Sequence, residues 1–364
     1  MCGPMRIVER YPPGFAFAGG TGAWRALFPL RLALAGLYGA LSCAARRAAL
    51  ASGRRPVSTT ASGKRPFVVS VGNISAGGGG KTPCVIALAE EIRSRAGTAV
   101  VVSRGYGGAM ERRGPCVVGG AGASAELART FGDEVALYAA RGIPVVTDAR
   151  RRRGAALAAD LFAPTHILLD DAFQHHSLAK DLDILLLDAG RPFEDGMLLP
   201  AGRLRELPGA ARRAGAVIFT RAREERVPAA AERFVAGKPV FFARHEAAFL
   251  KGRGGASEPL SIVSGREVVL FSGIARPDSF EETVVSLGAA PRASFRFEDH
   301  HRYAAREIEE IVRAGSPEAL FLTTEKDFVK AGDLFPPGAA VFAIAIEMRI
   351  SGLERLGALL GLGG

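Results

Sequence analysis

Short apolar runs alternate with helix-like stretches through the middle of this chain of 364 residues. Apolar runs of roughly four to eight residues between turn residues are typical of buried strands. The expected strands are Phe67–Val71, Ala99–Val102, Val145–Thr147, His166–Leu169, Asp183–Leu187 and Ala216–Phe219, and the expected helices are Thr82–Ser94, Phe131–Arg141 and Arg150–Leu161. This alternation predicts βαβ units and a mainly parallel sheet.

The pattern changes between Lys238 and Ser264, where an extended run, Val240–Arg244, is followed by the Gly-rich segment Lys251–Pro259. A second series of apolar runs then covers Glu267–Phe271, Ala319–Thr323 and Ala340–Ile344. Gly-rich connectors between periodic segments indicate boundaries. We therefore expect an N-terminal segment over residues 1–65, an α/β domain over 66–240, a linker over 241–265 and a smaller α/β domain over 266–364.

Residues 32–45 form an apolar stretch of about 14 residues between Arg31 and the pair Arg46–Arg47. A membrane-spanning helix needs about 20 residues, so this stretch is expected to be too short to span. Residues 1–65 contain ten Lys or Arg and one acid, and thus hold nearly all of the net charge of +10. An amphipathic helix with arginines at both ends suits a surface of anionic lipid. An ordinary buried helix remains the alternative, and the concentration of charge favours the membrane.

The rest of the chain is nearly neutral, and Trp24 is the one tryptophan. Nucleic-acid binding is therefore not expected, because it needs a basic surface interleaved with aromatic residues. The four cysteines lie far apart and form no C-x-x-C pair, so neither a zinc site nor a disulfide framework is indicated. This cysteine usage is typical of a reducing, cytoplasmic setting.

A glycine loop connects the first expected strand to the first expected helix, in the order Ser75, Ala76, Gly77–Gly80, Lys81 and Thr82. In a phosphate-binding loop, glycines let backbone N–H groups converge on phosphate, a lysine adds charge, and a Thr hydroxyl reaches Mg²⁺. Ser75 stands where the first glycine of that motif is usual. The alternative, a flexible Gly-rich hairpin, lacks the strand before and the helix after, so nucleotide binding is favoured.

Paired carboxylates, Asp170 and Asp171, come directly after the expected strand His166–Leu169. Carboxylates at this edge of a parallel sheet are where a P-loop enzyme holds Mg²⁺, directly or through water. Gln174 and His175 follow at positions that would face the same crevice. The alternative is a strand-end turn with solvated carboxylates.

Two further segments contain candidate acids and bases, Gly132–Glu134 and Phe297–Tyr303. Asp133 and a histidine of the second segment, His300 or His301, would have to converge across an interdomain cleft to form a base and its orienting partner. From the residues alone, Asp133 could equally stabilise a helix dipole, and the histidines could be surface or metal-binding groups.

The motifs together resemble the tetraacyldisaccharide 4′-kinases of the lipid A pathway. The resemblance extends from about Arg25 to Ala345 and is carried by Val71–Pro83, Ser103–Gly108, Gly132–Glu134, Asp170–His175, Leu199–Glu206, Phe297–His301 and Thr324–Asp327. Ser75 agrees with the family, in which Ser or Thr is common there. Ala172 and Val135 depart from it, since Gly and Pro are usual at those positions, which affects loop geometry and no reacting group.

This resemblance implies a P-loop NTPase-like fold with two α/β/α domains, an extended linker and an N-terminal amphipathic helix. It also implies transfer of the γ-phosphate of ATP, with Mg²⁺, to the 4′-hydroxyl of a tetraacyldisaccharide 1-phosphate. The residues it assigns to catalysis are Asp133, His300 (favoured over His301) and Lys81. It assigns nucleotide binding to Asn73, Ser75, Ala76, Gly77, Gly78, Gly79, Gly80, Lys81, Thr82, Gln174 and His175, and metal binding to Thr82, Asp170 and Asp171.

A substrate with four acyl chains is confined to a bilayer, so the resemblance also implies work at the cytoplasmic face of the bacterial inner membrane. Arg203 and Arg205 are candidates for substrate or phosphate contact, or for a structural salt bridge. The run Arg150–Arg153 is expected to be a solvated helix face, with lipid headgroups as the alternative. A P-loop switch or chaperone NTPase remains the rival function, although it would not need the histidine pair or the basic N-terminus.

Overall fold

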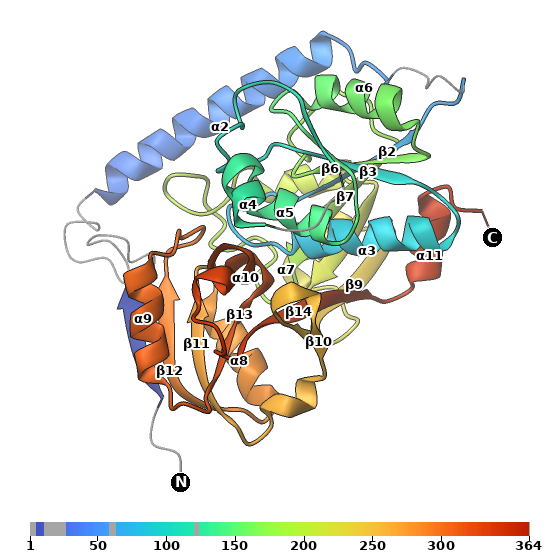
Figure 1. Ribbon diagram of the computed structural model, residues 1–364. Helices are drawn as coiled ribbons and strands as arrows, with labels where there is room; N and C mark the ends of the chain where they lie inside the picture. The colour runs from blue at the N-terminus through green and yellow to red at the C-terminus, as the bar shows by residue number, and fades with distance from the viewer. Residues whose placement is uncertain (1–4, 11–26, 58–62, 120–123, 364) are drawn as a thin grey trace. The chain divides into compact units, whose positions relative to one another are not determined.

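The computed structural model describes residues 5–10, 27–57, 63–119 and 124–363. It divides into two compact units. The colours of Figure 1 follow the chain from the N-terminus in blue to the C-terminus in red. The small unit consists of residues 1–19, 123–137 and 246–347, and the large unit of residues 20–122, 138–245 and 348–364. The expected boundaries at residues 65, 240 and 265 follow the chain in order, whereas the two units are interleaved along it.

A mainly parallel sheet forms the centre of the large unit. Its strands lie in the order β9-β8-β7-β2-β6-β3-β5-β4, and only β4 is antiparallel to its neighbour. Their bounds are β2 (Phe67–Gly72), β3 (Ala99–Ser103), β4 (Cys116–Val118), β5 (Val145–Thr147), β6 (His166–Asp170), β7 (Leu182–Asp188), β8 (Ala216–Thr220) and β9 (Val240–Lys251). The six strands predicted for this region are confirmed to within one residue at each end, because their apolar runs are continuous and buried on both faces.

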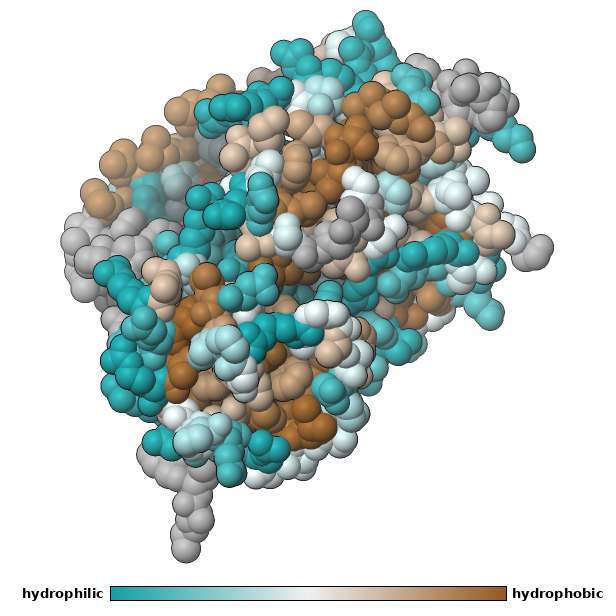
Figure 2. Space-filling view, in the orientation of Figure 1, coloured by the Kyte–Doolittle hydropathy of each residue, from teal (hydrophilic) through white to brown (hydrophobic). Residues whose placement is uncertain are grey.

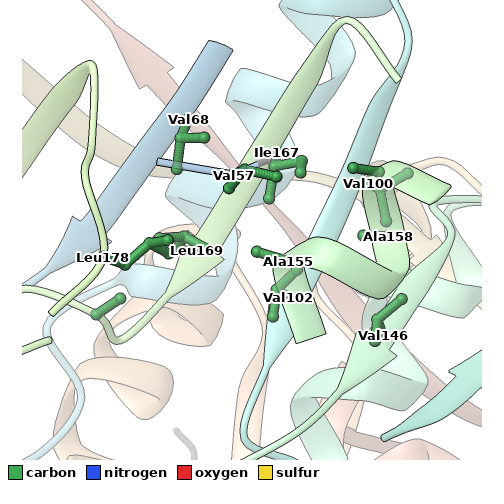
Figure 3. Packing of buried hydrophobic residues seen from close by; sticks show 12 residues of the cluster. Val57, Val68, Val100, Val102, Val146, Ala155, Ala158, Ile167, Leu169 and Leu178 are labelled. Carbon is green, nitrogen blue, oxygen red and sulfur yellow. The ribbon is translucent and has the colours of Figure 1, made fainter. Parts of the chain in front are cut away.

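Helices and 3-10 turns connect these strands. They are α2 (Phe28–Ala51), α3 (Lys81–Ser94), α6 (Arg151–Phe162), η1 (Pro208–Arg213), α7 (Ala229–Val235) and α11 (Leu353–Leu359). Figure 3 shows Ala155 and Ala158 of α6 packing against valines of β3 and β5. These alanines are completely buried and let the helix approach the sheet closely, which fixes the positions of the strand ends.

A second parallel sheet, in the order β1-β12-β11-β13-β14, forms the small unit. Its strands are β1 (Arg6–Arg10), β11 (Glu267–Ser272), β12 (Ala290–Phe297), β13 (Leu320–Thr324) and β14 (Val341–Ile350), and the short β10 (Ser257–Glu258) pairs with β9. Its helices are α4 (Ala125–Phe131), α8 (Pro277–Ser286), α9 (Ala305–Ala314) and α10 (Glu325–Ala331), with η2 (Arg253–Gly255), η3 (Leu260–Val263) and η4 (Gly332–Leu334). α5 (Asp133–Ala140) begins in this unit.

The helix expected over Phe131–Arg141 is two helices. α4 ends at Phe131, Gly132 takes a φ of 100°, and α5 starts at Asp133. A positive φ is readily adopted by glycine, which here redirects the chain between the helices. Asp133 is therefore placed in the first turn of a new helix.

The N-terminal segment differs from its prediction in two respects. α2 has 24 residues rather than about 14, because Pro29 is accommodated in its first turn and Arg46 and Arg47 continue the helix. By length and composition alone it could cross a bilayer, so the expectation that it is too short to span was wrong. The other difference is that Arg6–Arg10 are the edge strand of the small unit, paired with β12, and are not part of a membrane segment.

Leucines on one side of α2 are exposed. Figure 2 shows hydrophobic residues gathered along this helix, and among its residues only Ala35 is buried. Leu30, Leu34, Leu37 and Leu41 follow one another at helical spacing on this side, and Leu32 and Leu50 are exposed on the opposite side. On another side, Arg31 donates hydrogen bonds to the carbonyl oxygen of Pro200 at 3.1 and 2.8 Å, which ties the helix to the large unit.

Candidate functional site

The glycine loop lies between β2 and α3 in the large unit, as the sequence predicts. Gly77 and Gly80 have φ values of 111° and 78°, and Gly80 is the N-cap of α3 without a side-chain capping bond. The first N–H groups of a helix have no partner within it, and together with the helix dipole they favour an anion. The loop therefore ends at a helix start suited to phosphate.

Neighbouring side chains pack closely on this loop. The side-chain amide of Asn73 is buried, and its nitrogen lies 2.7 Å from the position that a Cβ at Gly79 would take. Within the described part of the chain this amide has no hydrogen-bond partner. Gln174 donates from Nε2 to the carbonyl oxygen of Asn73 and to Oε1 of Glu206, both at 2.9 Å. Asn73 therefore has unused polar atoms beside the loop, and Gln174 supports its backbone.

A hairpin around Arg203 covers the start of the loop. Ser75 forms a β-bridge with Leu204, and the N–H of Ala76 donates to the carbonyl oxygen of Arg203 at 2.7 Å. The guanidinium of Arg203 lies 3.0 Å from where a Cβ at Gly77 would be. Ser75 thus serves as a pairing residue at the position of the missing glycine, where its extended backbone does not require glycine.

The two carboxylates at the end of β6 have different partners. Nη1 of Arg205 donates to both carboxylate oxygens of Asp171, at 2.9 and 2.8 Å, and Nζ of Lys81 is 3.9 Å from Oδ1. Burial would raise the pKa of Asp171, but the charges of Lys81 and Arg205 overcome it, and the pKa is lowered. Of the two roles left open for Arg205, the structure provides the salt bridge.

Asp170 is buried and accepts a hydrogen bond from Oγ of Ser103 at 3.2 Å. It lies opposite Val71 of β2, next to the start of the loop, and Thr82 is buried in the first turn of α3. Among the described residues no group of three or more His, Cys, Asp or Glu could hold a metal by itself. A cation here would need a hydroxyl and phosphate oxygens in addition to carboxylate, which fits Mg²⁺ bound together with a nucleotide.

The histidines after the carboxylates are uncharged at neutral pH. Burial lowers the pKa of His175 to about 4, and the positive charge of Arg151 acts in the same direction. Burial also lowers the pKa of His176 to about 4, with Arg213 adding to the effect. Both side chains can therefore donate or accept hydrogen bonds without adding charge to the site.

The run Arg150–Arg153 is not uniformly a solvated face. Arg151 is only 3% exposed and donates to the carbonyl oxygens of Asp148 at 2.7 Å and Asp170 at 3.2 Å. Arg150 and Arg152 are exposed, and the exposed Arg153 pairs with Asp148. The expectation was wrong for Arg151, because this arginine satisfies the carbonyl groups at two strand ends.

Three residues of the loop's surroundings were missed by the sequence reasoning. Arg221 donates from Nη2 to the carbonyl oxygen of Gly78 at 2.9 Å and from Nη1 to Oδ2 of Asp188 at 2.7 Å. Nε2 of His245 lies 2.9 Å from where a Cβ at Gly80 would be. Asp188 ends β7, Arg221 follows β8, and His245 lies in β9 after its pairing with β8. The rule that ligands bind at the carboxyl ends of parallel strands could have identified them.

The small unit brings together Asp133 and His300. Nδ1 of His300 is 3.1 Å from Oδ2 of Asp133, and Nζ of Lys330 is 3.0 Å from the same oxygen. This pair was expected across an interdomain cleft; it lies within one unit, because residues 123–137 pack with residues 246–347. Lys330 was missed, since no local motif connects it to Asp133.

Electrostatics favour the ionised form of this pair. Burial would raise the pKa of Asp133, but the hydrogen bond from His300 and the charge of Lys330 lower it to about 2. The hydrogen bond to Asp133 raises the pKa of His300. His300 also has a φ of 64°, an uncommon backbone conformation for a residue with a side chain. At neutral pH the site thus holds an ionised carboxylate next to an imidazole whose pKa is raised.

His301 has a different environment from His300. Its ring stacks on Phe297 with centroids 4.5 Å apart, and its Nε2 is 3.1 Å from Oε2 of Glu307. Tyr303 packs against the same ring edge to face. These contacts occupy both the ring face and one nitrogen of His301, so the geometry favours His300 as the partner of Asp133.

Comparisons with known proteins agree with one another. A family model described as tetraacyldisaccharide-1-P 4′-kinase matches residues 27–360. A tetraacyldisaccharide 4′-kinase of Anaeromyxobacter dehalogenans strain 2CP-1 is 41% identical over 284 residues, covering 75% of this chain and 74% of the relative. One from Syntrophobacter fumaroxidans is 40% identical over 274 residues, covering 72% and 71%. A crystal structure of LpxK from Aquifex aeolicus in complex with ATP has 28% identity and a TM-score of 0.71, covering 93% of this chain and 98% of that one.

Proposed function

Because this chain belongs to the tetraacyldisaccharide-1-P 4′-kinase family, we propose that it transfers the γ-phosphoryl group of ATP to the 4′-hydroxyl of a tetraacyldisaccharide 1-phosphate. The bond between the γ-phosphorus and the bridging oxygen of ADP breaks, and a bond to the 4′-oxygen forms. The hydroxyl proton leaves to Asp133. The observation that carries the proposal is the presence of two groups in one chain, a phosphate loop and a buried Asp133–His300 pair.

The large unit would bind the donor. The N–H groups of the loop up to Gly80 and the ammonium of Lys81 would contact the β- and γ-phosphates, and the unused amide of Asn73 would orient the loop or its ligand. Thr82 and Asp170 would hold Mg²⁺, which supplies charge neutralisation on the phosphates. Asp171, already paired with Arg205, would keep Lys81 in place or contact the cation through water.

The small unit would act on the acceptor. A sugar hydroxyl is a poor nucleophile, and Asp133 would accept its proton while His300 orients the carboxylate. A positioned general base typically contributes roughly 10² to 10⁴ in rate. Phosphoryl transfer otherwise depends mainly on positioning and on neutralisation of charge.

The alternative function, that of a switch or chaperone NTPase, differs from the kinase because it needs no lipid acceptor. In the test, radiolabelled phosphate transfer from ATP to the disaccharide 1-phosphate is measured for the wild type, Asp133→Asn and the exposed control Asp160→Asn. We expect Asp133→Asn to lose transfer by roughly 10²- to 10⁴-fold with ATP binding retained. ATP hydrolysis that does not depend on the lipid acceptor would refute the kinase and support the switch.

We also propose that α2 attaches the protein to the membrane surface where its acylated substrate resides, on the cytoplasmic side of the bacterial inner membrane. Its leucines are 44–61% exposed at positions 30, 34, 37 and 41, on one side of the helix. Inserting a largely exposed leucine into an apolar phase gains roughly 1 kcal/mol or more, so the four together would give several kcal/mol. Arg46 and Arg47 near the end of the helix would add attraction to anionic lipid.

Flotation with anionic phospholipid vesicles tests this attachment. Deleting residues 1–60 would be a poor test, because it also removes β1 from the small unit. We instead compare Leu30→Ser/Leu37→Ser/Leu41→Ser with the control Leu161→Ser/Leu207→Ser/Leu334→Ser, whose leucines are 43–58% exposed elsewhere. We expect only the α2 variant to stop floating. Equal flotation of the two variants would contradict the attachment.

A further inference from the structure

Two lysines on one side of α10 contact the two consecutive acids at the start of α5. Nζ of Lys326 is 2.7 Å from Oε1 of Glu134, and Nζ of Lys330 is 3.0 Å from Oδ2 of Asp133. Residues four apart lie on the same side of a helix, so α10 presents both ammonium groups together. All four residues belong to the small unit. α10 therefore holds the first turn of α5 at two adjacent points.

Lys330 is itself held in place by a second carboxylate. Its side chain is 8% exposed, and its Nζ lies 3.3 Å from Oδ1 of Asp327, one turn earlier on α10. Asp327 is completely buried, and its Oδ2 accepts hydrogen bonds from the N–H of Gly273 at 3.0 Å and from Oγ1 of Thr324 at 2.7 Å. The ammonium of Lys330 thus has little freedom to leave Asp133.

The two oxygens of Asp133 are used differently. His300 and Lys330 both contact Oδ2, and within the described residues no side chain donates a hydrogen bond to Oδ1. We propose that Lys330 is a positioning residue: it fixes the rotamer of Asp133 so that Oδ1 accepts the proton of the attacking hydroxyl. This inference rests on the proposed kinase function, since it assigns the oxygen that meets the acceptor.

The charged surroundings of Asp133 determine what removal of Lys330 would do. Lys330 faces it from α10, His300 from the segment after β12, and Glu134 with its partner Lys326 from the adjacent position, while the buried Tyr303 hydroxyl interacts with it electrostatically. Burial alone favours the protonated acid, and the bond from His300 and the charge of Lys330 oppose it. Without Lys330, the pKa of Asp133 therefore rises.

The test compares the pH dependence of kcat for the wild type, Lys330→Gln and Lys330→Arg, with Lys238→Gln as a control in which a partly buried lysine of the large unit is lost. Because the base must be ionised, the acid limb of the Lys330→Gln profile is expected to move toward neutral pH. We also expect kcat to fall by about 10- to 100-fold with an unchanged KM for ATP, and Lys330→Arg to restore the acid limb. Circular dichroism at each pH separates this shift from earlier acid unfolding, because a variant that is only less stable loses its structure together with its activity along the acid limb.

An acid limb for Lys330→Gln that coincides with that of the wild type would overturn the inference. If Lys330→Gln alone does not fold because Asp327 is left buried and unpaired, the double variant Asp327→Asn/Lys330→Gln removes both charges and provides the same profile. A wild-type protein that transfers no phosphate to the disaccharide would instead refute the proposed function, so the two failures are distinguishable.

Discussion

Replacing Gly80 with alanine perturbs the phosphate loop at one well-defined point. Gly80 has a φ of 78° and precedes the first residue of α3. An L-residue in the left-handed region costs about 1–2 kcal/mol relative to glycine. The added Cβ would also lie 2.9 Å from Nε2 of His245 and 3.1 Å from Cε of Met348, so both side-chain ends must shift.

The cost is expected to appear in one of two measurable quantities. If the loop relaxes to another conformation when no ligand is bound, ATP binding must restore the strained conformation. A cost of about 1–2 kcal/mol then weakens ATP binding about 5- to 30-fold. If the loop cannot relax, the free energy of unfolding falls by about the same amount. The two losses together should therefore reach at least about 1 kcal/mol.

Calorimetric ATP titration and chemical denaturation measure these quantities. Gly119→Ala is the control, because Gly119 lies outside the loop, has no positive φ, and a Cβ there would have no atom within 4 Å. We expect the control to behave like the wild type in both assays. If Gly80→Ala matched Gly119→Ala in both assays, the left-handed loop geometry assigned to phosphate binding would be wrong.

Three further variants test other contacts. Arg205→Ala should lower the free energy of unfolding by less than about 1 kcal/mol, since the ion pair between Arg205 and Asp171 is partly exposed. The same variant should reduce phosphate transfer to the acceptor. A large loss of stability in chemical denaturation would contradict this prediction. Arg221→Ala should weaken ATP binding roughly tenfold by releasing Gly78, and an unchanged Kd would exclude that role. His300→Ala should destabilise the protein more at pH values below about 6.5 than at high pH, because a raised histidine pKa means stabilisation that is lost as pH rises through it. A difference in unfolding free energy that does not vary with pH would show that the pair with Asp133 is not electrostatic.

The loop and the strands could be predicted because their signals are local. Continuous apolar runs are typical of buried parallel strands. The glycines, Lys81 and Thr82 are adjacent in the sequence, and their order is that of a motif in which each residue type has a defined role in binding phosphate or Mg²⁺. The pairing of Arg205 with Asp171 joins residues 34 positions apart, and it exists only once the hairpin around Arg203 folds over the loop. Hydrophobic periodicity contains no information on such pairings.

The acceptor side was less accessible to prediction for a related reason. Periodicity indicates that the first turn of α5 is helical, but it does not indicate which sheet the helix packs on. Lys330 and Asp133 are 197 positions apart in the sequence. Lys330 also follows Asp327 by three positions, a spacing that in the sequence alone resembles an ordinary surface ion pair on a short helix. The length of α2 was underestimated because arginines were taken as helix ends, although they continue a helix readily.

The interleaving of the two units has a consequence for dissecting the protein. Residues 246–347 look like a detachable module, yet cut out alone they would carry His300 and Lys330 without Asp133 and would also lack β1. Asp327 and Lys330 would keep each other, but the imidazole would lose its carboxylate. In such a fragment the pKa of His300 should be raised only when a separate peptide spanning residues 123–137, which contains Asp133, is added. The unit proposed to act on the acceptor is therefore compact in the structure, but it cannot be produced as one continuous segment of the chain.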